Sequence, residues 1–358
     1  MKNLAIIGGG PIGLYTAIKL AKRGHKVTLF EKRSWPIDKV CGQGIMPSGV
    51  DNLINIGMTF TPFNSFTLNS IEYIERNSIL RGNLHGPAVG TKRTELSEQL
   101  FNIASQNPHI TLCPETKIDS INEKEDSYTL TIGPNILEFD FIFACDGLNS
   151  WTRKNTGHSK KRIIPSRIGA RIHYDIAPWS NSVQVYWSDS IEAYVTPISN
   201  KTIEVAFLWF KDSIESGANL KSKLLSHFPL LREKLIEEKS LNDFKGYGPF
   251  DEVSSSISHK NLFFLGDAYH FLDGITGEGI SLGIKASNII TDNFDNFGIK
   301  EKLKINFLYM NYWIWTHLAL LMSKSPFTRK IIFFFAKRNK YLFNYILKLN
   351  DLNLALLK

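Results

Sequence analysis

The sequence predicts an α/β fold in which a parallel sheet carries an inserted antiparallel sheet and a group of C-terminal helices. Short apolar runs at 4–7, 26–30 and 262–265, set among helical patterns, are typical of buried parallel strands. Between 161 and 250, short segments rich in Val, Ile, Tyr and Trp are separated by Pro, Asn, Asp and Ser, which is typical of antiparallel strands. Residues 221–239 have a helical pattern, and residues 299–358 place large apolar side chains at helical spacing.

The composition indicates a folded, cytoplasmic protein. The chain has 358 residues, of which 43% are hydrophobic and 21% charged, so it can bury a large core. Cys41, Cys113 and Cys145 lie far apart, which argues against a disulfide framework or a metal site and favours a reducing compartment. The first apolar run is too short for a signal peptide or a membrane span, so we expect the N-terminus to be part of the fold.

Positive charge is concentrated at the C-terminal end. Residues 301–358 hold ten Lys or Arg against two acids, Glu301 and Asp351, which accounts for the whole formal net charge of +8. The same segment carries 12 of the 43 aromatic residues. Because its basic residues are mixed with Trp, Phe and Tyr, we expect no nucleic-acid partner, and a helical cap that touches something apolar fits better.

The opening stretch predicts a dinucleotide-binding turn. A strand, the turn GGGPIG, a helix over 14–23 and a second strand follow each other, and Gly8, Gly10 and Gly13 match the G-x-G-x-x-G pattern of Rossmann-like folds. The first glycine permits the tight turn, the second lets a pyrophosphate approach the backbone, and the third lets helix and strand pack closely. The free N–H groups at the helix start then face the phosphates.

An acid closes the second strand. Glu31 lies 21 positions after Gly10, where its carboxylate can accept hydrogen bonds from both hydroxyls of an adenosine ribose. This element serves FAD and NAD equally, because the two cofactors share the same ADP half. The choice between them rests on other motifs.

A second glycine-rich turn favours a flavin. In the stretch LFFLGDAYHFLDGITGEGISLGIKAS, Asp267 follows a strand and can bind a ribityl hydroxyl, which NAD lacks. Gly277 and Gly279 lead into a helix that we expect from Ile280. A helix N-terminus directed at the N1 and C2 carbonyl edge of an isoalloxazine stabilises the negative charge of the reduced ring. We therefore predict FAD as the cofactor.

The chain resembles the FAD-dependent superfamily that contains aromatic hydroxylases, flavin halogenases and geranylgeranyl reductases. The likeness rests on the opening motif, on GDAYHFLDGITGEGI, and on FIFACDGLNSWTR, whose Asp-Gly pair is Asp146 and Gly147. In that family the Asp-Gly motif supports both FAD and nicotinamide binding, which would also implicate Ser150 and Arg153. The stretch KRTELSEQL matches the place where the family's Arg, here Arg93, reaches the flavin diphosphate.

Motif and resemblance together give the candidate cofactor-binding residues and the domains. The candidate cofactor-binding residues are Gly8, Gly10, Pro11, Ile12, Gly13, Glu31, Lys32, Arg93, Asp146, Asp267, Gly277, Gly279 and Ile280. The expected domains are a discontinuous FAD-binding domain at 1–70, 91–160 and 251–298, a substrate-binding β-sheet domain at 71–90 and 161–250, and a helical cap at 299–358. No second G-x-G-x-x-G is present, so NAD(P)H would bind transiently beside the flavin, unless a partner protein reduces it.

The loop at 39–57 carries the candidate catalytic residue. In the family this loop lies beside the flavin, and in archaeal geranylgeranyl reductases a Cys-Gly pair at the matching place borders the reacting double bond. Cys41 is therefore a candidate proton donor, and a small packed cysteine is the alternative. The inserted sheet would form a roof over the flavin, and an apolar cap suits a hydrophobic substrate.

The function that the sequence favours is an NAD(P)H-dependent FAD monooxygenase acting on a hydrophobic, aromatic or polyketide-like molecule. The alternative is a reductase of prenyl or lipid double bonds, with Cys41 as proton donor. A flavin halogenase ranks lower, because no W-x-W-x-I-P motif is present, and a non-catalytic electron-transfer flavoprotein also ranks lower. Gly274 replaces the proline that both the hydroxylases and the prenyl reductases usually carry. The resemblance leaves substrate and regiochemistry open.

The C-terminal helices are open to two interpretations. The stretches WIWTHLALLM and IIFFFAKRNKYLFNYILKL present broad apolar faces interrupted by Lys and Arg. Burial of such faces is worth several kcal/mol at roughly 25 cal/mol per Å², and each cation near anionic lipid adds about 1 kcal/mol. Peripheral membrane contact is one interpretation, and a buried cap or dimer interface is the other.

Overall fold

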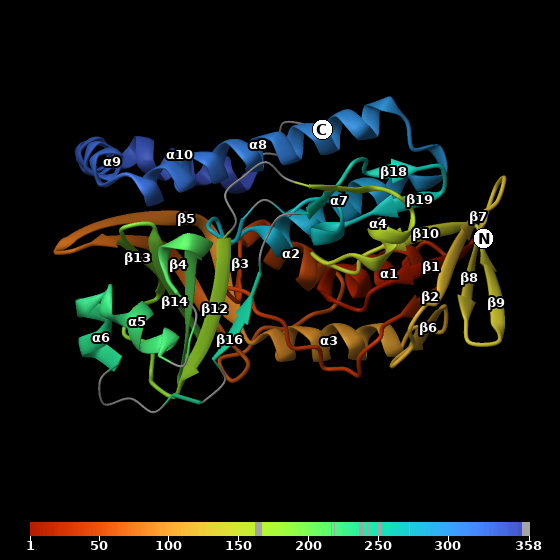
Figure 1. The fold of residues 1–358 in the computed structure, drawn as a ribbon, viewed down its shortest axis with the longest axis horizontal. Helices are drawn as coiled ribbons and strands as arrows, with labels where there is room; N and C mark the ends of the chain where they lie inside the picture. Colours follow the sequence, from red (N-terminus) through yellow and green to blue (C-terminus); the bar gives the residue numbers. More distant parts are fainter. Residues whose placement is uncertain are drawn as a thin grey trace.

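The computed structural model shows two halves joined by a long helical layer (Figure 1). It describes residues 1–352 except 162–166, 216, 218, 236–239, 242–243, 249–251 and 272. One half contains a parallel sheet with its helices, and the other contains a large curled sheet. The ends of the predicted 299–358 cap and of a helix expected over 221–239 lie outside the described residues.

The first half is built on a six-stranded sheet in the order β18-β19-β10-β1-β2-β6. All neighbouring strands are parallel except the edge pair β18 and β19. Helix α1 packs against α3 and α7. The elements of this half are β1 (Asn3–Ile7), α1 (Pro11–Lys22), β2 (Lys26–Phe30), α2 (Pro47–Asn55), α3 (Arg93–Ser105), β6 (Ile110–Cys113), β10 (Phe141–Ala144), α4 (Trp151–Asn155), β18 (Ser258–His259), β19 (Leu262–Phe264), η2 (Gly266–Ala268), α7 (Gly279–Asn293) and η3 (Phe294–Asn296).

The strand boundaries follow the sequence pattern closely, and the helix begins earlier than expected. Helix α1 begins at Pro11 instead of residue 14, because a proline at the first helical position loses no hydrogen bond and is already held at a helical φ. Its N-terminus therefore directly follows the glycine turn. Gly24, with φ +83°, allows the chain to turn back into β2.

The second half is an eight-stranded sheet in the order β16-β12-β15-β14-β13-β4-β5-β3. The prediction of a purely antiparallel sheet is wrong at one place, because β13 pairs with β4 in parallel. The sheet also includes residues 65–70, which the sequence assigned to the FAD-binding part. Its strands are β3 (Gly44–Ile45), β4 (Ser65–Glu75), β5 (Ser78–Thr91), β12 (Arg167–Tyr174), β13 (Ser182–Ser188), β14 (Ile191–Ser199), β15 (Thr202–Phe210) and β16 (Lys245–Tyr247).

Helices cover both faces of the large sheet. On one face, Phe207 and Trp209 pack with apolar residues of two short helices, α5 (Leu220–Ser226) and α6 (Pro229–Leu235). A single helix was expected here, but Pro229 lacks the N–H that a continuous helix needs and starts a new one. On the other face, Val185 and Trp187 pack with Leu320 of α8.

The C-terminal layer consists of three helices. They are α8 (Ile299–Lys324), α9 (Pro326–Arg338) and α10 (Lys340–Leu352). Helix α8 extends along both halves, and α9 and α10 lie over β5 (Figure 1). Ser325 ends α8 and caps α9, accepting a hydrogen bond from the Thr328 N–H, so a new helix begins directly after α8. Among the described residues, no helix is both long and apolar enough to cross a membrane.

Two small sheets complete the fold and were not predicted. One is the three-stranded β7-β8-β9 at the outer end of the parallel sheet, and the other pairs β11 with β17. Tyr128, Leu130 and Phe139 of the three-stranded sheet pack on the face of the parallel sheet opposite α1. The remaining elements are β7 (Ser120–Glu123), β8 (Tyr128–Ile132), β9 (Asn135–Phe139), β11 (Ser159–Lys161), β17 (Glu252–Ser254) and η1 (Lys211–Ser213).

Candidate functional site

A single continuous cavity of about 1010 Å³ extends from the glycine turn to the C-terminal helices. At one end it is lined by the β1–α1 turn, Glu31 and Arg93. In the middle it is lined by the loop around Cys41 and by the turn before α7. At the other end it is lined by the large sheet and by residues of α8, α9 and α10. The predicted cofactor and substrate regions are therefore one connected space.

The glycine turn lies where a side chain has no room. Gly8 has φ +105°, a conformation that L side chains rarely adopt. A Cβ on Gly13 would overlap the Gly8 carbonyl oxygen, and a Cβ on Gly9 would overlap the indole of Trp35. The Trp35 indole N–H donates to the Gly9 carbonyl oxygen at 3.0 Å and so fixes the turn. Gly10, Pro11 and Ile12 also line the cavity beside this turn.

Glu31 is buried at the end of β2 and faces the turn. Its carboxylate accepts hydrogen bonds from the N–H of Gly9 at 2.7 Å and from the N–H of Arg33 at 3.0 Å. A carboxylate has about four acceptor positions, so capacity remains for ribose hydroxyls. Lys32, the next residue, is exposed and lines the mouth of the same end of the cavity.

Arg93 is a buried cation that lacks an acidic partner among the described residues. It begins α3, is 9% exposed, and its Nε atom has no hydrogen-bond partner there. A Cβ placed on Gly10 would lie 3.9 Å from its terminal nitrogen, so the guanidinium lies over the glycine turn. An unpaired buried guanidinium is costly, and a pyrophosphate on the helix N-terminus would satisfy it.

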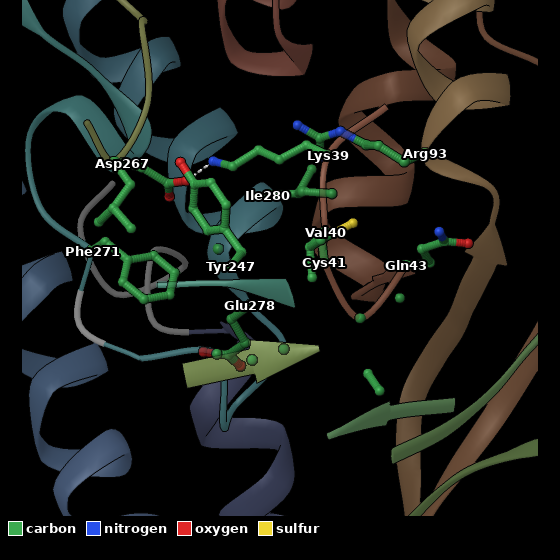
Figure 2. Close-up of a pocket in the computed structure, with 18 of the residues that line it drawn as sticks. Lys39, Val40, Cys41, Gln43, Arg93, Tyr247, Asp267, Phe271, Glu278 and Ile280 are labelled. Atoms are coloured by element: carbon green, nitrogen blue, oxygen red, sulfur yellow. Dashed lines mark hydrogen bonds and ion pairs between the residues drawn. The ribbon is translucent and has the colours of Figure 1, made fainter. Parts of the chain in front are cut away.

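Asp267 is held by a lysine that the sequence analysis overlooked. The Lys39 ammonium forms an ion pair with the Asp267 carboxylate at 2.7 Å, and Figure 2 shows the lysine reaching across to it beside Tyr247. Lys39 also lies over the Tyr247 ring, 5.3 Å from its centre. The predicted ribityl carboxylate therefore already carries one cationic partner. Lysine in a loop gives no periodic signal, so only the contact itself reveals it.

The Asp-Gly motif has an internal role in this structure. The Asp146 carboxylate accepts hydrogen bonds from the backbone N–H and hydroxyl of Thr152 at 2.9 and 3.0 Å, and the residue lines the cavity. Arg153 is fully buried and donates to the carbonyl oxygens of Leu148 and Ala268. Ser150 caps α4. Arg153 thus joins this motif to the Asp267 segment, and neither Arg153 nor Ser150 lines the cavity.

The second glycine turn presents a helix start to the cavity. Gly277 has φ +68°, and α7 begins at Gly279, one residue before the expected start at Ile280. All three residues line the cavity. The first N–H groups of α7 lack intrahelical partners, so this turn is suited to a negatively charged or carbonyl edge.

Cys41 lies in the middle of the cavity, as Figure 2 shows. Burial, aided by the Glu204 carboxylate, raises the pKa of its thiol, while the Arg93 charge opposes this shift. Cys41 therefore carries its proton at neutral pH, which suits a proton donor and not a thiolate nucleophile.

The Cys41 loop is fixed to the large sheet by a buried arginine. Arg171 of β12 donates to both carboxylate oxygens of Asp38 at 2.7 and 2.8 Å, and Lys245 of β16 pairs with the same carboxylate at 2.5 Å. Burial raises the pKa of the Asp38 carboxyl, but the two cations together lower it more. The pKa of Asp38 therefore lies below its usual value. The His173 ring bonds Gln43 at 3.1 Å, which holds the other side of the loop.

A second buried arginine fixes the turn before α7. Arg167, also on β12, pairs with Asp273 at 2.8 Å and with Glu192 of β14. Burial lowers the pKa of the Arg167 guanidinium, but the two carboxylates raise it more. The pKa of Arg167 is therefore raised, and Arg167 remains charged. The Tyr194 hydroxyl donates to the Ile275 carbonyl oxygen at 2.8 Å. This cluster gives no signal in the sequence, because its members lie far apart in the chain.

The far end of the cavity is an apolar chamber. Its walls come from β4, β13, β14 and β15 on one side and from the C-terminal helices on the other. Its lining residues include Ile71, Tyr73, Val185, Trp187, Tyr194, Leu208, Trp315, Leu318, Met322 and Phe343. A site of this composition favours a hydrophobic ligand.

Comparisons with known proteins agree with this architecture. The model of the FAD binding domain family matches residues 2–291. The chain is 24% identical over 337 residues to kynurenine 3-monooxygenase of Anopheles gambiae, covering 83% of this chain and 68% of that protein. It is 20% identical over 321 residues to menaquinone reductase of Mycolicibacterium smegmatis, covering 84% of this chain and 78% of that protein.

Solved structures share the fold. A triple mutant of the flavin-dependent brominase Bmp2 superposes with a TM-score of 0.83 at 15% identity, covering 98% of this chain and 94% of that one. A flavoprotein/dehydrogenase from Cytophaga hutchinsonii superposes with a TM-score of 0.80 at 17% identity. This match covers 93% of this chain and 88% of that one. The predicted fold class, with its Rossmann-like sheet, large second sheet and C-terminal helices, is confirmed, and the large sheet is mixed instead of antiparallel.

The residues present fit FAD. Gly10 leaves space for a pyrophosphate, because it lines the cavity and a Cβ there would meet only Arg93 at 3.9 Å. The buried Arg93 needs an anion, and Glu31 keeps free acceptor positions. The second glycine turn lies along the same cavity. The two ends of one extended cofactor would therefore each meet a suitable set of groups.

Replacing Arg93 with Ala should weaken FAD binding by about 10-fold to 100-fold, because a charge-assisted hydrogen bond is worth about 1.5–3 kcal/mol. The fluorescence of FAD titrated into apoprotein measures the change. The neighbouring Lys92→Ala is the matched control and should bind FAD as the wild type does. Equal affinity of the Arg93→Ala and Lys92→Ala proteins would show that Arg93 does not hold the cofactor.

Replacing Asp38 with Asn should lower the melting temperature at pH 7 and have progressively less effect in acid. The lowered pKa of Asp38 in the folded protein means that its stabilisation is complete above the usual value of 3.8 and is lost as the pH falls through the folded pKa. Thermal unfolding from pH 7 to about pH 3 tests this. Asp212→Asn, at an exposed acid, should melt as the wild type does throughout. A difference that stays constant with pH would contradict the ion-pair role of Asp38.

Proposed function

The chain belongs to the FAD binding domain family, and on this premise we propose that it is an NAD(P)H-dependent monooxygenase that hydroxylates a hydrophobic, aromatic or polyketide-like substrate. That it is an FAD-dependent oxidoreductase follows from the family. Relatives named for kynurenine and para-nitrophenol monooxygenation support the finer assignment. NAD(P)H as the transient reductant belongs to the proposal.

The observation that carries the proposal is the continuity of the cavity. The cradle formed by the two glycine turns opens directly into the apolar chamber, with Cys41 and the turn before α7 at the junction. A hydrophobic molecule in the chamber would lie against the end of the cofactor furthest from Glu31. Proximity of this kind replaces a bimolecular encounter with a held geometry.

The proposed reaction balances with one equivalent of each reactant. NAD(P)H, a proton, O₂ and the substrate C–H give NAD(P)⁺, water and the substrate C–OH. Bound FAD would supply hydride acceptance from NAD(P)H and the activation of O₂. One oxygen atom enters the product and the other leaves as water.

The chain's own groups contribute binding, charge and exclusion of water. The N–H groups at the start of α7 place positive potential on the cavity wall, and the Lys39–Asp267 ion pair holds the Asp267 carboxylate beside them. Trp187, Tyr73 and Leu208 line the chamber with apolar surface, which keeps water from reactive oxygen species. Two buried arginines hold the loops that carry these groups, so the site is preorganised.

Double-bond reduction is the second candidate, and Cys41 favours it. Its thiol is neutral and lies in the cavity between cradle and chamber. In this reaction NAD(P)H and a proton saturate a C=C bond, with hydride equivalents passing through FAD and the Cys41 thiol giving the proton, which solvent then restores. The menaquinone reductase relative supports this class.

Oxygen use separates the two candidates. The FAD-loaded protein, reduced by NADPH or NADH and offered kynurenine, para-nitrophenol or 1-naphthol under ¹⁸O₂, should give a hydroxylated product that carries one ¹⁸O atom. Without O₂ the same mixture should give no product. The same assay with added bromide tests the halogenase alternative. Anaerobic formation of a product with a saturated side-chain double bond from menaquinone or geranylgeraniol would replace the monooxygenase proposal with the reductase.

Replacing Cys41 with Ala should leave FAD binding and hydroxylation largely intact, because the proposed monooxygenation takes no proton from this thiol. If the protein reduces double bonds instead, the same change should slow reduction by about 100-fold to 10,000-fold, the usual contribution of a general acid. Steady-state rates with each substrate class measure this. Cys113→Ser, outside the cavity, is the control and should change neither rate.

A further inference from the structure

We propose that the C-terminal layer α8–α10 docks on an anionic lipid bilayer and that the substrate chamber opens toward that surface. The docking stands on its own observations. The role of the opening as a substrate entrance rests on the proposed function. The layer is a regular part of the described fold, extending along both halves of the molecule (Figure 1).

Helix α8 has two apolar faces. Its inner face packs into the core through Ile305, Leu308, Tyr312, Thr316 and Leu320. On the opposite side, an outer stripe is exposed although it is apolar. The members of this outer stripe are Leu303, Phe307, Met310, Ile314 and Leu321. The exposed fraction is 61% for Leu303 and 53% for both Met310 and Leu321. They follow each other at steps of four, three, four and seven residues, which keeps them on one side of a helix.

The exposed apolar surface continues over the next two helices. Of the 23 large hydrophobic side chains that are exposed among the described residues, 15 belong to α8–α10. Those beyond α8 are Phe327, Ile331, Phe334 and Phe335 of α9, and Tyr341, Leu342 and Tyr345 of α10. An exposed apolar area of this extent marks an interaction surface.

Lysines flank the outer stripe. With the helical period, Lys300 and Lys304 lie on one side of it and Lys302 and Lys324 on the other. The Lys324 ammonium also lies over the Phe210 ring, 4.5 Å from its centre. No carboxylate of the described residues forms an ion pair with any of the four. The nearby acid Glu301 is engaged, since its carboxylate accepts the N–H of Gly298 at 3.0 Å. An apolar stripe bordered by cations matches the interface of an anionic bilayer, with the helix lying in the plane.

A lipid surface fits this face better than a second copy of the chain does. Two copies meeting across the outer stripe would bring the flanking lysines of both helices together without acids between them, and like charges opposed in this way weaken association. Anionic headgroups would instead neutralise these lysines.

The chamber reaches this surface. Leu318 of α8 is 44% exposed and also lines the cavity, and Met322, Ile332 and Phe343 line the cavity beside it. The layer is held in place by Arg329, which is buried, pairs with Glu75 of β4 at 2.9 Å and donates to the last carbonyls of α8. A hydrophobic molecule dissolved in the bilayer would therefore meet an entrance at a fixed position.

The experiment is co-sedimentation of the FAD-loaded full-length protein with sucrose-filled vesicles. Vesicles of phosphatidylcholine with about 30% phosphatidylglycerol should pellet the protein, and phosphatidylcholine alone should bind it at least about tenfold more weakly. Leu303→Ser/Phe307→Ser/Met310→Ser should lose binding. The matched control is Phe63→Ser/Ile136→Ser/Leu230→Ser, which alters residues outside the C-terminal layer that are at least as exposed as Phe307 and should bind as the wild type does.

A charge pair completes the test. Lys302→Glu/Lys304→Glu should reduce binding to anionic vesicles by at least about tenfold, whereas Lys160→Glu/Lys161→Glu, with the same change in net charge, should not. Bound FAD absorbance confirms that each variant folds. Failure of the wild type to pellet, equal losses in the controls, or a dimer that the triple variant dissociates would each overturn the proposal. Vesicle binding is measured without turnover. A failed monooxygenase assay would therefore not change the outcome of the vesicle-binding test.

Discussion

The site depends on two buried arginines of a single strand. Arg167 and Arg171 lie four residues apart on β12, so their side chains share one face of the sheet. The first pairs with Asp273 before α7 and the second with Asp38 beside Cys41. Removing one partner of a fully buried pair, such as Arg167 with Asp273, costs about 3–5 kcal/mol, because a charge is left without compensation. The two loops are therefore fixed relative to the sheet that forms the chamber.

This arrangement explains how two halves with separate cores act as one site. The parallel sheet and the large sheet each have their own apolar cluster, and apolar packing alone would permit small shifts between them. Directional ion pairs restrict such shifts, since charge-assisted hydrogen bonds such as those from one terminal nitrogen of Arg171 to both Asp38 oxygens require a particular geometry. The Lys39 and Asp267 pair adds a third fixed point on the cofactor side. Polar contacts thus set the position, and apolar packing supplies most of the stability.

The sequence was most informative where the signal is local. Periodicity located β1 and β2, and the glycine spacing located the turn whose crowding the structure shows at Gly13. It could not supply pairs such as Arg171 with Asp38 or Arg167 with Asp273, which are 133 and 106 residues apart. Nothing in a single sequence distinguishes these arginines from exposed ones. The parallel pairing of β13 with β4 was missed for the same reason, because it joins distant segments.

The low amphipathicity of α8 follows from its two apolar faces. A helix that only covers a core has one apolar face, whereas α8 is apolar both toward Leu208 and Trp187 of the large sheet and toward its outer stripe. Because both faces belong to one rigid helix, contact of the outer stripe with any surface fixes the orientation of the chamber toward that surface. Leu318, which belongs to the cavity and to the exterior, lies where these two requirements meet. The position of the chamber's opening is therefore a consequence of helix geometry and needs no additional element.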